Sequence, residues 1–223
     1  GQAFDEDARE AVAGVVRQGD YDLADWDDPG RERGSEAAVR RHRRRLRHGL
    51  DVPEGLRVVV DVGNGAGRLT ADVLADAGCW VRTLDGQRDG RFPARGSEPT
   101  ATACRGLGRT VEAFGADLGV AHDGDADRMV AVDGSGSFVD GDVLLALFAR
   151  DAVDPGDAVA VPVNASRLVD DVVAEAGGEV ERTKVGDVHV ASRAREERVV
   201  FGGEPSGAWI WPDETLCPDG PYA

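Results

Sequence analysis

Three carboxylates alternate with other residues over five positions, and this is the most chemically informative pattern in the chain. They are Asp123, Asp125 and Asp127, and Arg128 follows directly. Unit charges about 4 Å apart interact by about 4 kcal/mol at an effective dielectric constant of about 20, so carboxylates held this close repel strongly. A bound cation removes that repulsion, and oxygen ligands alone favour Mg²⁺, Ca²⁺ or Mn²⁺ over Zn²⁺. The pattern therefore predicts a divalent-cation site.

Two other interpretations of the acidic stretch compete with this one. An EF-hand calcium loop needs Gly at its sixth position and Glu at its twelfth, where this chain has Arg128 and Gly134. A solvated acidic turn is the simpler alternative, and the fixed positive charge of Arg128 counts against it. An arginine beside a cation site suits a ligand that bridges both, so we expect phosphate there.

Short apolar runs must position this loop, because residues 117–121 precede it and residues 129–133 follow it. Both runs predict strands that meet at the edge of a sheet. Elsewhere, strand-like and helix-like segments alternate along the chain. The expected strands are 56–61, 79–84, 158–163, 179–183 and 199–201, and the expected helices include 5–18, 69–77, 143–149, 166–176 and 188–195. Such alternation predicts mostly parallel sheets with helices on both faces.

The alternating pattern runs once and begins again after Asp154-Pro155-Gly156. We therefore predict an α/β fold of two consecutive three-layer α/β/α domains with mixed, mostly parallel sheets, preceded by the helical tail of a third such domain. The expected bounds are 1–52 for the helical tail, 53–153 for the domain with the metal loop, and 154–223 for the second domain. We expect this second domain to stop at the opening of its last helix.

Helix starts are predicted from side chains that can accept a bond from a free backbone N–H. We expect Ser35 to cap a helix that ends near His48, Asp140 to cap the helix at 143–149, and either Thr100 or Thr102 to cap a helix that ends near Gly115. The first of these helices carries six arginines, which we interpret as a solvated face rather than as a phosphate site. They are Arg40, Arg41, Arg43, Arg44, Arg45 and Arg47.

Composition limits the class of function. Acidic residues number 42 against 26 basic ones, a net charge of −16, so we expect neither nucleic acid nor a membrane surface as partner. The chain has no apolar run of about 18 residues and no signal peptide, which predicts a cytoplasmic location. The scattered Cys79, Cys104 and Cys217 fit reduced, buried side chains better than disulfides or zinc ligands.

A glycine-rich turn at residues 62–67 follows one predicted strand and opens a predicted helix. The outline is similar to a dinucleotide-binding turn and to the first motif of methyltransferases that use S-adenosylmethionine. The dinucleotide pattern needs a glycine where this chain has Arg68. The methyltransferase interpretation leaves the acidic loop unexplained, and a single sheet of that class would not begin again near Asp157. It is kept as the alternative function.

A second loop, residues 202–207, follows the predicted strand that ends at Phe201. Open α/β sheets place ligands at strand ends of this kind. Glu204 and Ser206 alternate, so both side chains can point to one side and offer groups suited to vicinal sugar hydroxyls. A tight loop without a ligand is the structural alternative.

Taken together, these segments resemble the α-D-phosphohexomutases, the family of phosphomannomutase, phosphoglucomutase and phosphoglucosamine mutase. The resemblance covers the turn at 61–67, the acidic loop at 123–128, residues 183–187 and the loop at 203–207, in the family's order. It implies a Mg²⁺ cofactor and a hexose phosphate substrate. The implied metal ligands are Asp123, Asp125 and Asp127, and the implied substrate-binding residues are Arg128, Lys184, Glu204 and Ser206.

The resemblance also implies a reaction, in which an isomerase interconverts hexose 1-phosphate and 6-phosphate through a phosphoserine and a bisphosphate intermediate. No serine of this chain is followed by His-Asn, as the family's serine loop requires. We therefore expect that serine upstream of Gly1 and a phosphate-binding domain beyond Ala223, so that the chain alone is inactive and holds no catalytic residue. Ala208 stands where many members carry a histidine. A sugar-phosphate-binding remnant without catalysis stays open, and the sequence does not identify the hexose.

Overall fold

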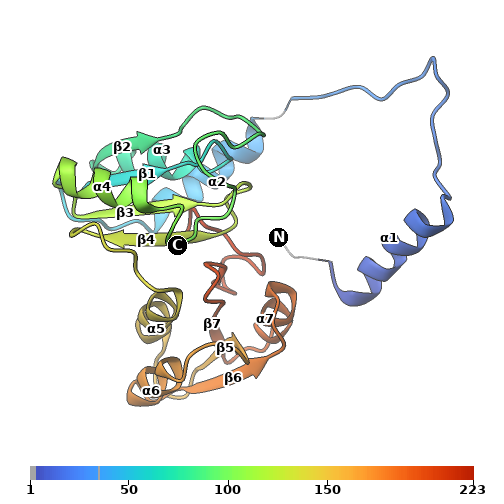
Figure 1. Ribbon diagram of the computed structural model, residues 1–223. Coiled ribbons are helices and arrows are strands. Elements are labelled where there is room, and N and C mark those ends of the chain that lie inside the picture. Colours follow the sequence, from blue (N-terminus) through green and yellow to red (C-terminus); the bar gives the residue numbers. More distant parts are fainter. Residues whose placement is uncertain (1–3, 35) are drawn as a thin grey trace.

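The computed structural model describes residues 4–34 and 36–223, and it contains two α/β units of the same design (Figure 1). The first unit is drawn from teal to yellow-green, and the second lies below it from orange to red. Two α/β domains with mixed, mostly parallel sheets confirm the predicted fold class. Ser35, the predicted cap of the second helix, lies outside the described residues.

The first unit contains a four-stranded sheet in the order β2-β1-β3-β4. Its strands are β1 (Arg57–Asp61), β2 (Trp80–Leu84), β3 (Leu118–His122) and β4 (Met129–Asp133). β1 pairs in parallel with β2 and β3, whereas β3 and β4 are antiparallel because the short acidic loop joins them directly. The acidic loop therefore lies at the carboxyl end of β3.

Two helices cover the faces of this sheet, α3 (Arg68–Asp76) and α4 (Arg105–Phe114). Successive side chains of β1 point to opposite faces, so Val58 and Val60 belong to the cluster that contains Ala71 of α3. Val59, between them, packs with Leu107 of α4. Burial on both faces explains why this strand is a continuous apolar run.

The second unit repeats the arrangement with the strand order β6-β5-β7-β8. Its strands are β5 (Ala158–Pro162), β6 (Glu179–Thr183), β7 (Val199–Gly203) and β8 (Trp209–Ile210), and its helices are α6 (Leu168–Glu175) and α7 (Asp187–Arg193). β5 pairs in parallel with β6 and β7, and β7 pairs antiparallel with β8. The loop with Glu204 and Ser206 thus joins β7 to β8, as the acidic loop joins β3 to β4.

Helix α5 (Gly141–Ala152) connects the two units and packs against α6 and β7. The expected boundary at residue 154 assigns this helix to the first unit, although its main neighbours belong to the second. Leu145 of α5 lies in one apolar cluster with Val60, Met129 and Phe201, which come from both sheets. The two units therefore share a continuous core.

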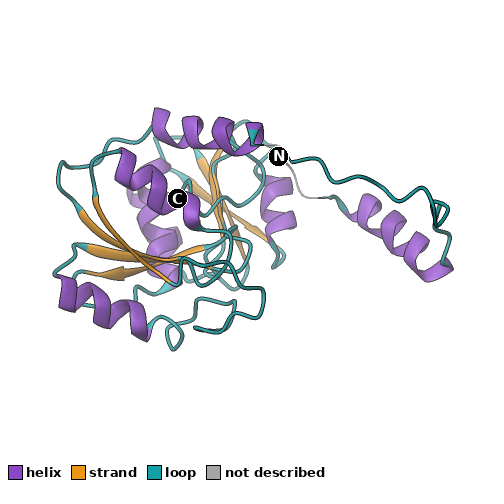
Figure 2. Cartoon of the chain, turned by 90° about the horizontal axis from the view of Figure 1, so that it is seen from above, coloured by secondary structure: helices purple, strands orange, loops and turns teal. Residues whose placement is uncertain are grey.

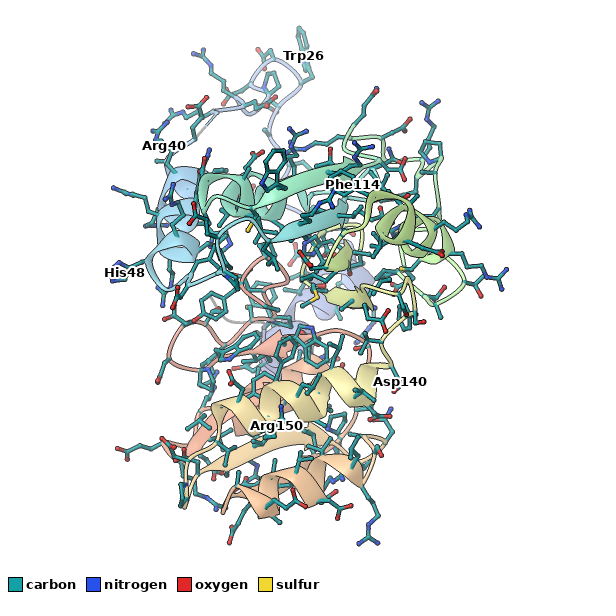
Figure 3. All side chains as sticks on the ribbon, turned by 90° about the vertical axis from the view of Figure 1, so that its left-hand side faces the viewer. Trp26, Arg40, His48, Phe114, Asp140 and Arg150 are labelled. Atoms are coloured by element: carbon teal, nitrogen blue, oxygen red, sulfur yellow. The ribbon has the colours of Figure 1, made fainter. Side chains whose placement is uncertain are left out.

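Helix α1 (Glu6–Gln18) projects from the two units (Figures 1 and 2), and none of its residues is buried, although its first turn lies beside α7. Residues 19–34, which precede α2 (Ala37–His48), are exposed, and Trp26 points away from the rest of the molecule (Figure 3). Arginines of α2 pair with acids of this same chain: Arg43 and Arg47 with Asp76, and Arg45 with Glu214. These pairs agree with a structural role for the basic run.

The predicted helix starts have different outcomes. Asp140 caps α5, because its Oδ1 accepts a bond from the backbone N–H of Asp142 at 2.9 Å. The prediction for α4 was wrong, since the helix begins at Arg105 after Cys104 and has no side-chain cap. Thr100 Oγ1 accepts from the backbone N–H of Ala103 at 3.3 Å, so this threonine stabilises the turn before the helix.

The cysteines are free thiols; Cys79 and Cys104 are buried as predicted, whereas Cys217, also expected to be buried, is only half-buried. Burial raises the pKa of Cys104 to about 11, so this thiol stays protonated at neutral pH. Within residues 4–34 and 36–223, no helix is both long enough and apolar enough to cross a lipid bilayer.

Candidate functional site

The structure brings the three alternating carboxylates together. Asp123, Asp125 and Asp127 each have an oxygen atom within 4.8 Å of an oxygen of the other two. Asp123 is buried, Asp127 is half-buried and Asp125 is exposed, so the group opens to solvent on one side. Because Mg²⁺ holds its oxygen ligands at about 2.1 Å and Ca²⁺ at about 2.4 Å, one cation can contact oxygens spaced in this way.

Asp127 carries the clearest electrostatic sign of a cation site. Burial and, next, the negative charges of Asp123 and Asp125 raise its pKa to about 7, while Arg128 opposes the shift. Its Oδ1 atom is buried and has no hydrogen-bond partner in the described part of the chain. A buried carboxylate oxygen without a partner is costly, and a coordinated cation would satisfy it. The donor set therefore fits Mg²⁺ or a similar hard cation.

The glycine-rich turn at residues 62–67 packs directly against the acidic loop. The backbone N–H of Ala66 donates to the carbonyl oxygen of Gly124 at 3.1 Å. A Cβ atom on Gly65 would lie 2.5 Å from that oxygen, and one on Gly67 would lie 2.6 Å from the ring of His122. These glycines therefore permit close approach of the acidic loop, and the turn is filled by the chain's own residues. The methyltransferase interpretation is not favoured.

A long loop between β2 and α4, residues 85–99, holds the acidic loop from the side. The buried Arg95 donates from Nε to Asp61 Oδ2 at 2.8 Å and from Nη2 to the carbonyl oxygen of His122 at 2.6 Å. Asn64 fixes this loop, because its Nδ2 donates to the carbonyl of Gln87 at 2.8 Å and its Oδ1 accepts from Ala94 N–H at 3.3 Å. Sequence reasoning missed Arg95, since the polar loop carries no periodic pattern.

Strained backbone gathers around the same loop. In the described part of the chain, the non-glycine residues with positive φ are Asn64, Asp85, Phe92 and Ala126. Ala126 belongs to the acidic loop itself, and the others belong to the segments that contact it. Left-handed conformations of such residues concentrate at functional sites, where the surroundings hold them in place.

Arg128 lies at the acidic loop as predicted, but acids of this chain already neutralise it. Its Nη1 donates to Glu98 Oε2 at 2.6 Å, and its Nε lies 3.6 Å from Asp123 Oδ2. About one third of its side chain is exposed, so the guanidinium can reach a ligand at the surface. An incoming phosphate would compete with Glu98 for this arginine.

The loop at residues 202–207 carries Glu204 and Ser206 and contacts the turn that carries Lys184, the other three predicted binding residues. Ser206 Oγ donates to Glu204 Oε2 at 3.4 Å, so both side chains point to one side. Glu204 Oε1 accepts from the backbone N–H of Gly186 at 2.7 Å, which connects this loop to the turn containing Lys184. Lys184 is exposed, and its ammonium group has no ion-pair partner in residues 4–34 and 36–223.

The two loops meet across the domains. The backbone N–H of Met129 donates to the carbonyl oxygen of Gly207 at 3.0 Å, and Trp209 Nε1 donates to the carbonyl oxygen of Met129 at 2.8 Å. Arg128 and Ala208 form an antiparallel β-bridge. Ala208 is buried and contributes only backbone and a methyl group to this contact. The acidic loop and the loop with Glu204 are therefore fastened side by side.

Comparison with known proteins agrees with this architecture. Residues 43–136 match the family model described as phosphoglucomutase/phosphomannomutase, alpha/beta/alpha domain II, and residues 140–223 match the model of domain III. The chain belongs to this family, the α-D-phosphohexomutases, which the sequence resemblance indicated.

Individual relatives show the same pattern. The chain is 47% identical over its full length to a probable phosphoglucosamine mutase of Methanopyrus kandleri and 45% identical to one of Methanosarcina acetivorans. It spans about half the length of these curated relatives, 50% and 51%. A crystal structure of a phosphoglucomutase/phosphomannomutase family protein from Burkholderia thailandensis is 27% identical and superposes with a TM-score of 0.86, covering all of this chain and 48% of that one.

Proposed function

We propose that these residues form the metal-binding and sugar-binding parts of a magnesium-dependent phosphohexomutase, which interconverts hexose 1-phosphate and hexose 6-phosphate. One observation carries the proposal: the backbone pairing of Arg128 with Ala208 and of Met129 with Gly207 holds the loop of three carboxylates against the loop that we propose binds the sugar. A sugar phosphate can contact both loops at once only if the cation site and the hydroxyl-binding side chains lie this close together.

The three aspartates would hold Mg²⁺. The buried Asp127 oxygen, which accepts no hydrogen bond within the described residues, and the closeness of the three carboxylates support this assignment. A cation bound there supplies positive charge that stabilises the negative charge of a transferring phosphoryl group. The protein's own contribution is to hold three oxygens close together before the cation arrives, which costs no reorganisation during the reaction.

The remaining predicted residues would bind the sugar phosphate. Glu204 and Ser206 offer an acceptor and a donor to adjacent sugar hydroxyls, and the Gly186 contact keeps the carboxylate of Glu204 in position. The unpaired ammonium of Lys184 and the guanidinium of Arg128 would attract the phosphate. Two hydroxyl-binding groups together with two cationic side chains suit a phosphorylated sugar.

The phosphoryl donor lies outside these residues in this proposal. The family's Ser-His-Asn sequence does not occur among the 223 residues, so we propose that a further part of the protein supplies the phosphoserine and that these residues alone do not turn over substrate. Because the matched relatives are named phosphoglucosamine mutases, glucosamine phosphate is the first sugar to test.

The test is a ³¹P NMR assay of the intact protein with glucosamine 6-phosphate, repeated with glucose and mannose 6-phosphates. We expect Mg²⁺-dependent appearance of the 1-phosphate, its loss on chelation, and its loss in the Asp125→Ala variant. Asp171→Asn, which changes an exposed acid on α6, serves as the matched control and should retain activity. Absence of conversion for every sugar, or conversion that survives chelation, would contradict the proposal. Conversion by the 223-residue chain alone would refute the proposed external phosphoserine.

A further inference from the structure

His122 is a buried polar residue that the proposed function leaves without a role. It is the last residue of β3, directly before Asp123, and its side chain is completely buried. Both ring nitrogens have partners: Nδ1 lies 2.9 Å from the carbonyl oxygen of Arg128, and Nε2 lies 2.7 Å from Thr70 Oγ1 of α3. A histidine that bonds on both sides is fixed in its orientation.

These partners determine which nitrogen carries the proton. A backbone carbonyl can only accept, so the Nδ1 of His122 must be the donor toward Arg128. The Nε2 atom of the neutral ring then has a lone pair, which accepts the hydroxyl proton of Thr70. Thr70 is itself 8% exposed, so water competes little for this bond. The carbonyl of Arg128 therefore selects the tautomer, and the hydroxyl of Thr70 satisfies the remaining ring nitrogen and holds the ring in this orientation.

The ring closes the base of the acidic loop. His122 precedes Asp123, and Arg128 follows Asp127, so the Nδ1–H···O bond joins the two ends of the five-residue segment that holds all three carboxylates. The backbone N–H of Arg128 adds a bond to Asp123 Oδ1 at 3.2 Å across the same gap. Without these bonds, repulsion among the carboxylates would tend to open the loop.

Backbone segments approach the ring closely on two sides. A Cβ atom on Gly67 would lie 2.6 Å from the ring, and one on Gly220 would lie 2.8 Å from Nδ1. Arg95 holds the backbone of the same residue, because its Nη2 donates to the carbonyl oxygen of His122 at 2.6 Å. The ring is thus held by the glycine turn, the C-terminal segment and α3 together.

We infer that His122, oriented by the hydroxyl of Thr70, is a positioning residue that sets the spacing of the three metal-binding carboxylates. The inference rests on the proposed metal site and adds a support that acts through the backbone of Arg128. Outer partners of this kind change metal affinity by about 10- to 100-fold when they are removed.

The experiment removes the hydroxyl and keeps the shape. Thr70→Val deletes the donor to Nε2, and Thr70→Ser restores it. Thr110→Val is the matched control, because Thr110 Oγ1 bonds to the carbonyl of Gly106 within α4, away from the acidic loop. Each variant is made in the intact protein and is first checked for folding by circular dichroism. Mg²⁺ affinity is then measured by titration calorimetry, and ¹⁵N NMR reports the tautomer of His122 and the amide shifts of residues 124–127.

We expect Thr70→Val to weaken Mg²⁺ binding about tenfold and to change the His122 nitrogen shifts, whereas Thr70→Ser and Thr110→Val stay within about twofold of wild type. Unchanged Mg²⁺ affinity in folded Thr70→Val would overturn the inference, as would an equal loss in Thr110→Val. If the wild-type protein binds no Mg²⁺, the proposed Mg²⁺-dependent function is contradicted. The positioning role then depends on the amide shifts: movement of residues 124–127 in Thr70→Val supports it, and no movement overturns it.

Discussion

Met129 and Gly207 join the two halves of the site through one backbone bond, in which the Met129 N–H donates to the Gly207 carbonyl oxygen at 3.0 Å. Met129 follows the acidic loop, and Gly207 ends the loop that contains Glu204 and Ser206. Each loop connects a parallel strand to an antiparallel edge strand in its own sheet. The same connection occurs once in each domain, and this backbone bond holds the two loops side by side.

Trp209 reinforces this junction and gives the first prediction. The indole is completely buried, and its Nε1 donates to the Met129 carbonyl oxygen. Trp209→Phe removes that bond and part of the ring volume, so we expect the free energy of unfolding in urea to fall by about 2 kcal/mol. Trp80→Phe is the control, because Trp80 is 67% exposed, and its effect should stay within about 0.5 kcal/mol. An equal fall in the free energy of unfolding for the two variants would contradict a stabilising role of Trp209 at this junction.

Gly65 tests the role of the glycine turn. Alanine there would place its Cβ 2.5 Å from the Gly124 carbonyl oxygen, so the acidic loop must move. We expect Gly65→Ala to weaken Mg²⁺ binding at least tenfold and to lower the melting temperature. Gly106→Ala, at an α4 position with open space around the new methyl group, should leave Mg²⁺ binding unchanged and stabilise the helix slightly. Wild-type affinity in Gly65→Ala would show that the turn does not support the loop.

The pKa of Asp127 predicts a pH-dependent response to Mg²⁺. Burial and two neighbouring carboxylates raise this pKa to about 7, well above the ordinary aspartate value of 3.8. In the metal-free protein between about pH 4 and pH 7, Asp127 is therefore protonated in the folded state and ionised in the unfolded state. The stabilisation that this protonated carboxyl contributes to the free energy of unfolding is fully present below about pH 4 and is lost as the pH rises through about 7. Mg²⁺ needs the deprotonated form, so it should raise the melting temperature more at about pH 8 than at about pH 6.

Differential scanning fluorimetry with Mg²⁺ or a chelator at both pH values measures this difference. The Asp127→Asn variant supplies the control, because it cannot titrate and should respond weakly to Mg²⁺ at either pH. An equal Mg²⁺ shift at the two pH values in the wild-type protein would contradict the raised pKa of Asp127.

Two substitutions of Glu204 separate the effect of its negative charge on sugar binding from the effect of its hydrogen bond to Gly186. Its Oε1 accepts from the Gly186 N–H at 2.7 Å, a bond that a glutamine oxygen can also accept. We expect Glu204→Ala to weaken binding of a hexose phosphate more than Glu204→Gln, because only alanine frees the turn that contains Lys184. Calorimetric titration of the sugar phosphate into the intact protein measures both. Identical losses would mean that the Gly186 contact does not matter for binding.

The sequence was sufficient for the fold because the central strands β1 and β5 are buried on both faces and read as short apolar runs, with helix-like segments between the strands. Asp123, Asp125 and Asp127 could be identified because they are neighbours in the chain. Arg95 and Glu98 could not, since the fold brings a patternless loop to residues about 30 positions away. The starting point of α4 was also missed, because threonines at 100 and 102 look like caps, while the helix begins only after the intervening turn.

The central claim is that the three alternating aspartates bind one divalent cation beside the loop with Glu204 and Ser206. A crystal of the intact protein soaked in Mn²⁺, with anomalous difference density collected near the manganese edge, tests it most directly. The account predicts one peak in contact with oxygens of Asp123, Asp125 and Asp127, and no such peak in an Asp125→Ala, Asp127→Ala crystal. A wild-type crystal without density between these carboxylates, or with the metal bound elsewhere, would contradict it.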